Sequence, residues 1–488
     1  MTGPGIPVIL AVQAGMTRQH GCKQRSVTAG FSRKSAVFAT VCRFEAFAEV
    51  HIVIVGLTLA AERTAMIPQE IAQTIVDPKA YADGKRVDDA FSYLRKEMPL
   101  AQAQPEGFDP FWVVTKHADI LEVERQNELF HNGDRATVVT PIEVDKKVRE
   151  LMGGSPHLVR SLVQMDNPDH FNYRRLTQSW FMPQNLKKLE ARIREIAKGF
   201  VDRMADMNGT CDFARDVAFL YPLHVIMEVL GVPETDEPRM LKLTQELFGS
   251  ADPDLNRSGA EVMDADAALA QIGATVGEFI TYFNEMTEDR RANPRDDLAS
   301  VIANGQIEDK PLGHLEAMSY YIIAATAGHD TTSNTTAGGL WALAENQDQL
   351  AKLKADPSLI SSYLEESIRW VTPVKHFMRS ATADAEVHGQ KIAKGDWLML
   401  SYPSGNRDDD VFADPFAFKV DRSPNKHVAF GYGAHVCLGQ HLGRMEMRIL
   451  WEELLPRLQT LELAGEPKRM AANFVCGPKS VPIRYRMN

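Results

Sequence analysis

The sequence has few cysteines, no surplus of positive charge and no long apolar run near its N-terminus, and each shortage excludes a class of protein. Its five cysteines are odd in number, scattered and free of any C-x-x-C pair, which disfavours a disulfide framework or structural zinc site and fits a reducing cytoplasm. The formal net charge of -11 argues against a nucleic-acid partner, because neutralising phosphates needs surplus Lys and Arg. The longest apolar run in the first 65 residues, 52–61, is too short to cross a bilayer, so we expect no membrane anchor.

The first 65 residues differ in composition from the rest. They carry seven Lys or Arg against three Glu, with no acidic residue before Glu45. This composition permits a transit-peptide interpretation, but no sustained amphipathic helix accompanies it. Met66, followed by Ile-Pro, has the features of a natural start. We therefore expect residues 1–65 to be a non-structural N-terminal extension read from an upstream start, and residues 66–488 to form a single domain.

Apolar spacing predicts a mainly α fold with a small β region. Apolar residues at alternating intervals of three and four predict a helix over 182–207, and Asn167-Pro168 predicts the start of a helix that ends at Trp180. The longest helix is predicted over 312–346, roughly 50 Å at 1.5 Å per residue. Short strands joined by Gly turns are predicted within 374–402, and a final helix over 438–458.

A glycine-rich segment, Phe430-Gly-Tyr-Gly-Ala-His-Val-Cys-Leu-Gly439, is the most informative part of the sequence. Three glycines within nine residues predict a backbone that turns sharply or closely approaches another group. Cys437 is expected where this turn meets a helix N-terminus, whose free N–H groups stabilise a thiolate. Taken alone, such a residue is more often an inert buried cysteine.

The segment as a whole resembles the haem-binding signature of the cytochrome P-450 family. The matching positions are Phe430, Gly431, Gly433, His435, Cys437 and Gly439. The resemblance implies a fold in which haem b (iron protoporphyrin IX) lies between the long helix and this loop, with Cys437 as the axial ligand of the iron. It also implies that His435 donates a hydrogen bond to a haem propionate, and that Phe430, Gly433 and Gly439 shape the loop. A thiolate ligand pushes electron density onto iron and favours O–O cleavage.

A second segment, Ala327-Gly-His-Asp-Thr-Thr332, lies in the middle of the predicted long helix. Gly and Thr are poor helix formers, so a reason other than helix stability is expected for them; the alternative is an accidental run of Thr. The segment resembles the oxygen-activation motif of the same family. This implies that Asp330 and Thr331 are the acid and alcohol that deliver protons during dioxygen reduction.

A third pair, Glu366 and Arg369, lies at i and i+3 on one helical face. As a bare pair it is a surface salt bridge. It also resembles the family's E-x-x-R motif, which implies a buried network with Arg422 that supports the cysteine loop without taking part in catalysis.

Three further residues are expected to contact the cofactor. His170 and Arg174, at i and i+4, can present two donors on one face, although a solvated helix face is the alternative. By resemblance both reach the haem propionates, and so does Arg379. Four cationic or donor groups around two propionates are electrostatically reasonable.

Within the family, the chain resembles bacterial members that hydroxylate monoterpene alcohols such as α-terpineol and linalool. The similar segments are Tyr221–Val225, Gly231–Glu234 and Ala472–Val475. The resemblance implies a monooxygenase that inserts one atom of O2 into a small apolar substrate, a monoterpenoid or a small aromatic or alicyclic compound. The residues placed in the substrate pocket by this resemblance are Ala324, Ala325, Val374, Phe377 and Phe474.

The electrons are expected to come from separate proteins. The chain carries no flavin or ferredoxin signature, so the implied donors are NAD(P)H, a ferredoxin reductase and a [2Fe-2S] ferredoxin. We expect a locally basic face that includes Arg444 to meet the acidic ferredoxin. Two alternatives remain: a haem-thiolate protein that binds, senses or rearranges without activating O2, and a thiol hydrolase that pairs Cys437 with a histidine.

Overall fold

The computed structural model describes residues 25–29, 37–41 and 65–488 apart from residue 262. Two short strands, β1 (Arg25–Ala29) and β2 (Val37–Val41), form an antiparallel pair. The rest of the N-terminal extension lies outside the described residues, so the expectation that it is non-structural stays a prediction.

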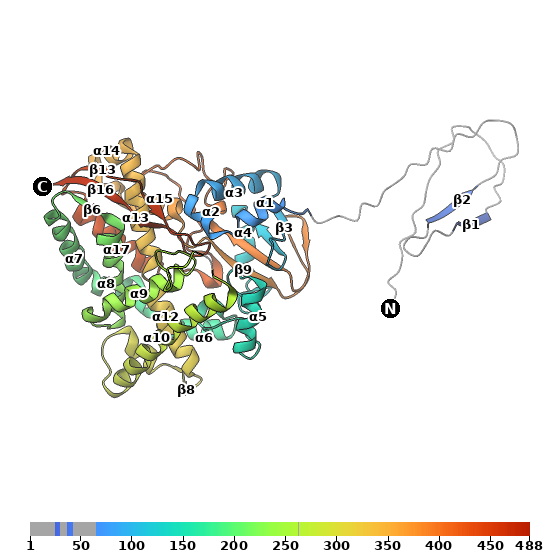
Figure 1. Cartoon of the computed structure of the whole chain (residues 1–488), viewed down its shortest axis with the longest axis horizontal. Helices are drawn as coiled ribbons and strands as arrows, with labels where there is room; N and C mark the ends of the chain where they lie inside the picture. Colours follow the sequence, from blue (N-terminus) through green and yellow to red (C-terminus); the bar gives the residue numbers. More distant parts are fainter. Residues whose placement is uncertain (1–24, 30–36, 42–64, 262) are drawn as a thin grey trace. The chain divides into compact units, whose positions relative to one another are not determined.

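The described residues from 65 onward form one unit in which helices predominate (Figure 1). Helices α7, α8 and α17 lie on one side of this unit, and α1 to α4 lie with strands β3 and β9 on the other. The prediction of a mainly α fold with a small β region is confirmed. The helices are α1 (Gln69–Thr74), α2 (Pro78–Asp83), α3 (Lys85–Glu97), α4 (His117–Arg125), α5 (Ile142–Leu151), α6 (Asp169–Thr177), α7 (Pro183–Asp206), α8 (Leu220–Leu230), α9 (Glu237–Phe248), α10 (Ala265–Ala292), α11 (Leu298–Ala303), α12 (His314–Ala327), α13 (Asp330–Glu345), α14 (Gln347–Ala355), α15 (Ile360–Val371), α16 (Tyr402–Gly405) and α17 (Gln440–Leu454).

The largest sheet has the strand order β3-β4-β12-β9-β5. Its pairs are antiparallel except β4 with β12, which run parallel. The strands expected within 374–402 are therefore present, and two of them form the middle of this sheet. The strands are β3 (Leu100–Ala103), β4 (Phe111–Val114), β5 (Phe130–His131), β6 (Thr210–Asp212), β7 (Gln306–Ile307), β8 (Lys310–Pro311), β9 (His376–Ala381), β10 (Ala385–Val387), β11 (Gln390–Ile392), β12 (Trp397–Ser401), β13 (Leu458–Leu463), β14 (Lys468–Arg469), β15 (Pro478–Ser480) and β16 (Pro482–Met487).

The main core lies between helices whose apolar stripes the sequence already shows. Helix α7 buries Leu186, Ile193 and Phe200 and packs against α17, while α13 packs against α15. The burial of each such side chain contributes about 1.5–3 kcal/mol relative to its exposure to water. This packing fixes α13, α15 and α17 relative to one another, and these helices carry the segments singled out above.

The prediction of a single long helix over 312–346 is wrong, because the structure has two helices in this range. Helix α12 ends at Ala327 and α13 begins at Asp330. At Gly328 a Cβ would lie 2.7 Å from Ile226 Cγ1, so only glycine allows α8 to approach this closely. The Thr331 hydroxyl donates to the carbonyl of Ala327 at 3.0 Å, one of the side-chain bonds that compete with helical hydrogen bonding. Two other helices are shorter than expected: α6 begins only at Asp169 and α17 covers only Gln440–Leu454.

No helix in the described residues is both long and apolar enough to cross a membrane.

Candidate functional site

The cysteine loop occupies the residues just before α17 and is shaped by its glycines. Gly431 and Gly433 have φ of 67° and 70°, a region that glycine adopts at little cost. A Cβ on Gly433 would lie 2.4 Å from the carbonyl oxygen of Glu124, at the end of α4. The Cys437 amide donates to the Phe430 carbonyl at 2.8 Å and closes the loop. The sharp turn predicted from the glycine spacing is therefore present.

Cys437 lies half-buried immediately before α17. Burial raises the pKa of its thiol, while backbone N–H groups of Gly439 and Gln440 and the guanidinium groups of Arg174 and Arg444 lower it. Burial outweighs these lowering effects and the pKa of the thiol is raised, so a metal cation bound at the sulfur would be needed to favour the thiolate.

The predicted propionate-binding residues come together beside this loop, from three separate parts of the chain. His170 and Arg174 lie on α6, Arg379 on β9, and His435 in the loop itself. The rings of His170 and His435 lie 4.0 Å apart between centroids, and Arg174 Nη2 donates to the carbonyl of Val436 at 2.8 Å. The expectation of a solvated helix face for His170 is wrong, because this side chain is buried.

His170, Arg174, Arg379 and His435 are called the donor group here, and their hydrogen bonds are incomplete. Nε2 of His170 is buried without a hydrogen-bond partner in the described structure. Burial and the neighbouring Arg174 lower the pKa of His170 to about 4. Burial, then Arg379, His170 and Arg174, hold the pKa of His435 well below its usual range. Two arginines that lower the pKa of the neighbouring histidines, and a buried ring nitrogen without a partner, fit an anionic group bound among them, as the carboxylates of haem would be.

Glu124 was not identified from the sequence, yet it lies against Arg379. Its carboxylate accepts from Tyr402 Oη at 2.7 Å and from Arg379 Nη2 at 3.4 Å, and its other oxygen has no partner in the described structure. Burial raises the pKa of Glu124 to about 7, against the lowering effects of Arg379 and Tyr402. One sequence signal was available: on α4, Glu124 shares the apolar face of Ile120 and Val123.

Asp330 and Thr331 lie at the break between α12 and α13. Asp330 is 1% exposed, and its Oδ2 has no hydrogen-bond partner in the described structure. Nδ1 of His329, another residue that sequence reasoning did not single out, lies 3.5 Å from this oxygen. The other ring nitrogen of His329 lies 2.7 Å from the carbonyl of Phe219, and Nδ1 also lies 3.2 Å from the Thr244 hydroxyl.

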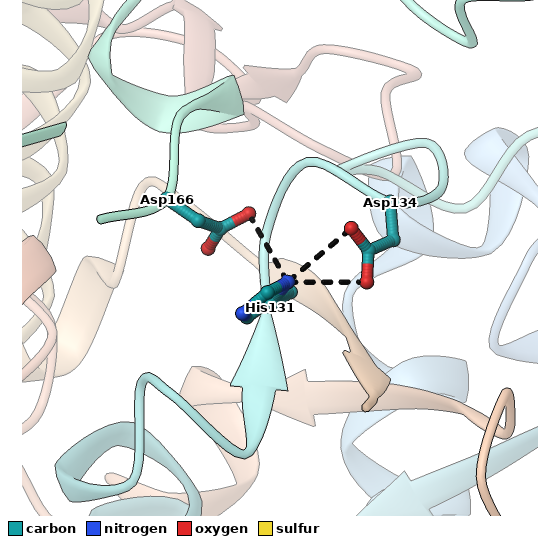
Figure 2. A group of neighbouring side chains, drawn as sticks. All are labelled: His131, Asp134 and Asp166. Carbon is teal, nitrogen blue, oxygen red and sulfur yellow. Dashed lines mark hydrogen bonds and ion pairs between the residues drawn. The ribbon is translucent and has the colours of Figure 1, made fainter. Parts of the chain in front are cut away.

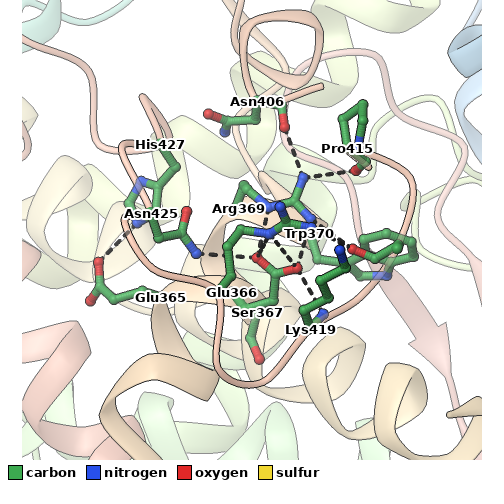
Figure 3. Close-up of polar contacts among 12 residues, drawn as sticks. Glu365, Glu366, Ser367, Arg369, Trp370, Asn406, Pro415, Lys419, Asn425 and His427 are labelled. Atoms are coloured by element: carbon green, nitrogen blue, oxygen red, sulfur yellow. Dashed lines mark hydrogen bonds and ion pairs between the residues drawn. The ribbon is translucent and has the colours of Figure 1, made fainter. Parts of the chain in front are cut away.

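Glu366 and Arg369 are fully buried and paired (Figure 3), so the surface-salt-bridge alternative is wrong. Arg422 joins this pair with 6% of its side chain exposed. Arg369 donates twice to the Glu366 carboxylate, each at 2.7 Å, and Arg422 Nε donates at 2.9 Å. Asn425 adds a third side-chain donor. The remaining guanidinium hydrogens of Arg369 reach the carbonyls of Asn406, Pro415 and Ala417. The network therefore joins α15 to the segment that leads into the cysteine loop.

Arg444, on α17, contacts α15 and is not a free surface cation. It donates to Glu365 at 2.6 and 3.1 Å, and His427 contacts the same carboxylate. Burial of Glu365 is outweighed by His427 and Arg444, which lower its pKa to about 2. Arg444 thus joins α17 to α15.

His131, Asp134 and Asp166 form a group of possible metal ligands (Figure 2). Nδ1 of His131 lies 3.2 Å from Asp134 and 3.9 Å from Asp166. However, both Asp166 oxygens already accept backbone amides, from Asn132 and Gly133, each at 2.8 Å. This arrangement ties the β5 loop to the segment before α6, and so it helps to place His170.

The predicted substrate-pocket residues are partly brought together. The rings of Phe377 and Phe474 lie 5.3 Å apart, and Phe248 of α9, not predicted, lies 6.2 Å from Phe474. Val374 pairs with Val475 in an antiparallel bridge, next to Phe474. Ala324 and Ala325 lie on α12; Ala325 is fully buried in the main core, whereas Ala324 is half-buried.

Comparisons with known proteins agree with this geometry. The family model described as "Cytochrome P450" matches residues 144–484. Cytochrome P450-terp of a Pseudomonas species is 48% identical over 86% of this chain and 98% of its own length. Linalool 8-monooxygenase of Pseudomonas putida is 31% identical over 81% of this chain and 94% of its own length. The crystal structure of CYP108D1 from Novosphingobium aromaticivorans aligns with a TM-score of 0.79 at 45% identity, covering 87% of this chain and all of that one.

A family match over more than half of the chain, with relatives of this identity over nearly their whole length, settles the class of protein. Members of the family bind haem through a cysteine thiolate and insert one oxygen atom of O2 into their substrates. The donor group beside Cys437 fits such a cofactor. The chain therefore belongs to the cytochrome P-450 family and is a haem-dependent monooxygenase with the family's fold.

Proposed function

We propose that Cys437 is the thiolate ligand of haem b in this monooxygenase. The observation that carries the proposal is the convergence of Arg174, Arg379, His170 and His435 beside Cys437, with Nε2 of His170 unpartnered, which suits a dianionic cofactor. Arg174, Arg379, His170 and His435 would bind its propionates. When bound, the haem supplies dioxygen activation, which a thiolate ligand favours.

Replacement of the ligand tests this assignment. Cys437→His should lose the red-shifted carbon monoxide band that a thiolate gives, and should hold haem weakly. Cys476→Ser is the matched control, because Cys476 is also a free buried cysteine but lies outside the loop. An unchanged carbon monoxide spectrum in Cys437→His would remove this cysteine from the iron.

The proposed catalytic residues are Asp330 and Thr331, which would move protons to the place where dioxygen is reduced. The Thr331 hydroxyl donates to the Ala327 carbonyl and can also accept, so it can pass a proton along the break between the helices. Asp330 is buried with one oxygen unpartnered, so it can relay a proton after a small rotation. Neither residue belongs to the donor group that would hold the haem.

The proposed substrate is small and apolar: a monoterpenoid, or a small aromatic or alicyclic compound. Phe248, Phe377 and Phe474 give an aromatic wall, and one relative is named for linalool oxidation. A screen of monoterpene alcohols and small aromatic compounds for the low-spin to high-spin absorbance shift tests this. Shifts given only by long-chain or charged compounds would contradict it.

The proposed electron donor is a [2Fe-2S] ferredoxin served by an NAD(P)H-dependent reductase, in the cytoplasm. The loop tip carries exposed Tyr432, and Arg125 lies 5.0 Å from the centre of its ring. With Arg444 paired to Glu365, Arg125 is the cation we expect to meet an acidic ferredoxin. Ferredoxin-limited turnover should fall between low and moderate salt, and less steeply in Arg125→Gln. Identical salt dependence in both proteins would exclude Arg125 from the contact.

A further inference from the structure

A cavity of about 140 Å³ lies away from the cysteine loop, and nothing above explains it. Its walls come from α2, α3, the last turns of α13, the end of α15 and the two strands β14 and β15. A water molecule takes up about 30 Å³ in the liquid, so the cavity has room for several waters or one small organic molecule. None of the donor group, Cys437, Asp330 or Thr331 lines it.

Three cations line the cavity: Lys375, Arg407 and Arg469. In the part of the chain that the structure describes, none of them has a carboxylate oxygen within the 4.0 Å of an ion pair, although Asp88 and Glu345 also line the cavity. Burial, then the nearby Arg469, lowers the pKa of Lys375 to about 8, while Cys476 opposes this. Burial also lowers the pKa of Arg407 to about 10. These cations therefore lack the direct ion-pair partners that most buried charges have.

Two N–H groups that line the cavity also lack hydrogen-bond acceptors. Nε of Arg407, a side chain 8% exposed, and Nε1 of Trp341 are both buried with no partner in the described structure. Lys375 and the ends of the Arg407 guanidinium donate to the last carbonyls of α15 and thus cap that helix. An unpaired buried N–H costs about 1–3 kcal/mol, so the cavity favours a ligand that brings acceptors.

Arg469 and the two tryptophans give the cavity its chemical selectivity. The Arg469 guanidinium lies over the ring of Trp341 at 4.5 Å, and that of Arg407 over Trp370 at 4.6 Å. A Cβ on Gly84 would lie 2.5 Å from Arg469 Nη1, so a side chain at residue 84 would displace the guanidinium from this position. A ligand in this cavity would meet a fixed cation, N–H donors and apolar ring surface together.

From this arrangement we propose that the cavity is a binding site for a small organic carboxylate, held by Arg469 and by the N–H groups of Arg407 and Trp341. The site is separate from the haem site. It shares one structural element with the proposed substrate pocket: the segment 470–477, whose backbone is tied to Pro373 and Lys375 by hydrogen bonds of 2.9 and 2.8 Å. A bound carboxylate would hold that segment in place.

The test is a calorimetric titration of the full-length, haem-loaded protein with benzoate, with the Soret band recorded in parallel. Benzoate should bind without moving the haem spectrum. Its neutral isostere benzamide should bind about tenfold more weakly or worse, because a charge-assisted hydrogen bond contributes that much. Bound benzoate should also slow amide hydrogen exchange across 470–477.

Variants assign the binding to this cavity. Arg469→Gln should weaken benzoate binding about tenfold or more, and Trp341→Phe, which keeps the ring but removes the N–H, should weaken it several-fold. Arg203→Gln is the control, because the guanidinium of Arg203 also lies over a ring, that of Phe200 at 4.0 Å, but outside the cavity. Inorganic phosphate is titrated in parallel. The proposal is overturned by any one of four results: equal binding of benzoate and benzamide, unchanged affinity in both cavity variants, binding only of inorganic phosphate, or no binding at all.

Discussion

Two groups of charged side chains support the cysteine loop or the segment that leads into it, and they differ in whether their hydrogen bonds are complete. In the Glu366 network, every donor of Arg369 and both oxygens of Glu366 have partners within the protein. In the donor group of His170, Arg174, Arg379 and His435, Nε2 of His170 is buried without a partner in the described structure, and burial together with the two arginines holds the pKa of His435 well below its usual range. The difference separates roles: a group complete by itself serves the fold, whereas an incomplete one is built for a ligand.

The largest effect is expected from removing the negative charge of the Glu366 network. Glu366→Gln leaves two buried guanidinium groups without a counter-charge and should cost about 3–5 kcal/mol of unfolding free energy, measured by urea unfolding, with poor haem incorporation. Glu462→Gln is the control, because its pair with Arg484 is long and both side chains are exposed. Its cost should stay below about 0.5 kcal/mol. Equal stability of the two variants would show that the network is not what supports the loop.

A change at the break between α12 and α13 should affect chemistry and leave the fold intact. We expect Thr331→Ala to keep its haem and its substrate-induced spin shift while it consumes NAD(P)H and diverts most of the flux to hydrogen peroxide. Thr335→Ala, which removes an equivalent hydroxyl one turn later, should stay coupled. Asp330→Asn should instead slow turnover. The readout is product formed per NAD(P)H, and wild-type coupling in Thr331→Ala would favour a haem protein that does not activate O2.

Glu124 belongs to neither group completely, because one of its oxygens is bonded and the other is not. Its pKa of about 7 in the folded protein is raised above the ordinary 4.5, so folding favours the protonated form. The stabilisation is present at low pH and is lost as pH rises from about 4.5 through 7, by on the order of 1 kcal/mol per pH unit. The unfolding free energy of Glu124→Gln should therefore gain on that of the wild type between pH 5 and 8. Parallel pH curves would show that Glu124 does not titrate in this range.

The smallest effect is expected from the N-terminal extension, because every residue named in the two groups lies after residue 65. A chain that starts at Met66 should express, bind haem and turn over as the full-length protein does. The measurements are haem content per chain and product per NAD(P)H. Loss of haem on truncation would show that residues 1–65 support the fold.

Much of the site was predictable because its residues act through local patterns. The glycine spacing around Cys437 predicts a tight loop before a helix, and the i, i+3 spacing of Glu366 and Arg369 predicts one shared face. The helical spacing within 182–207 likewise predicts α7. These features depend on backbone geometry over a few residues, which the sequence determines directly.

Tertiary structure alone decided the remaining features. The break at Gly328 depends on how closely α8 approaches, and the burial of Glu366 depends on segments 40 to 60 residues away. Glu124 meets Arg379 across 255 residues, and Arg407 and Arg469 reach one cavity from different elements. The sequence by itself determined the mainly helical class, helix α7, the cysteine loop and the resemblance to the family, because these follow from short-range spacing. Which buried charges find partners depends on long-range packing, and that packing separates the complete network from the site that needs a ligand.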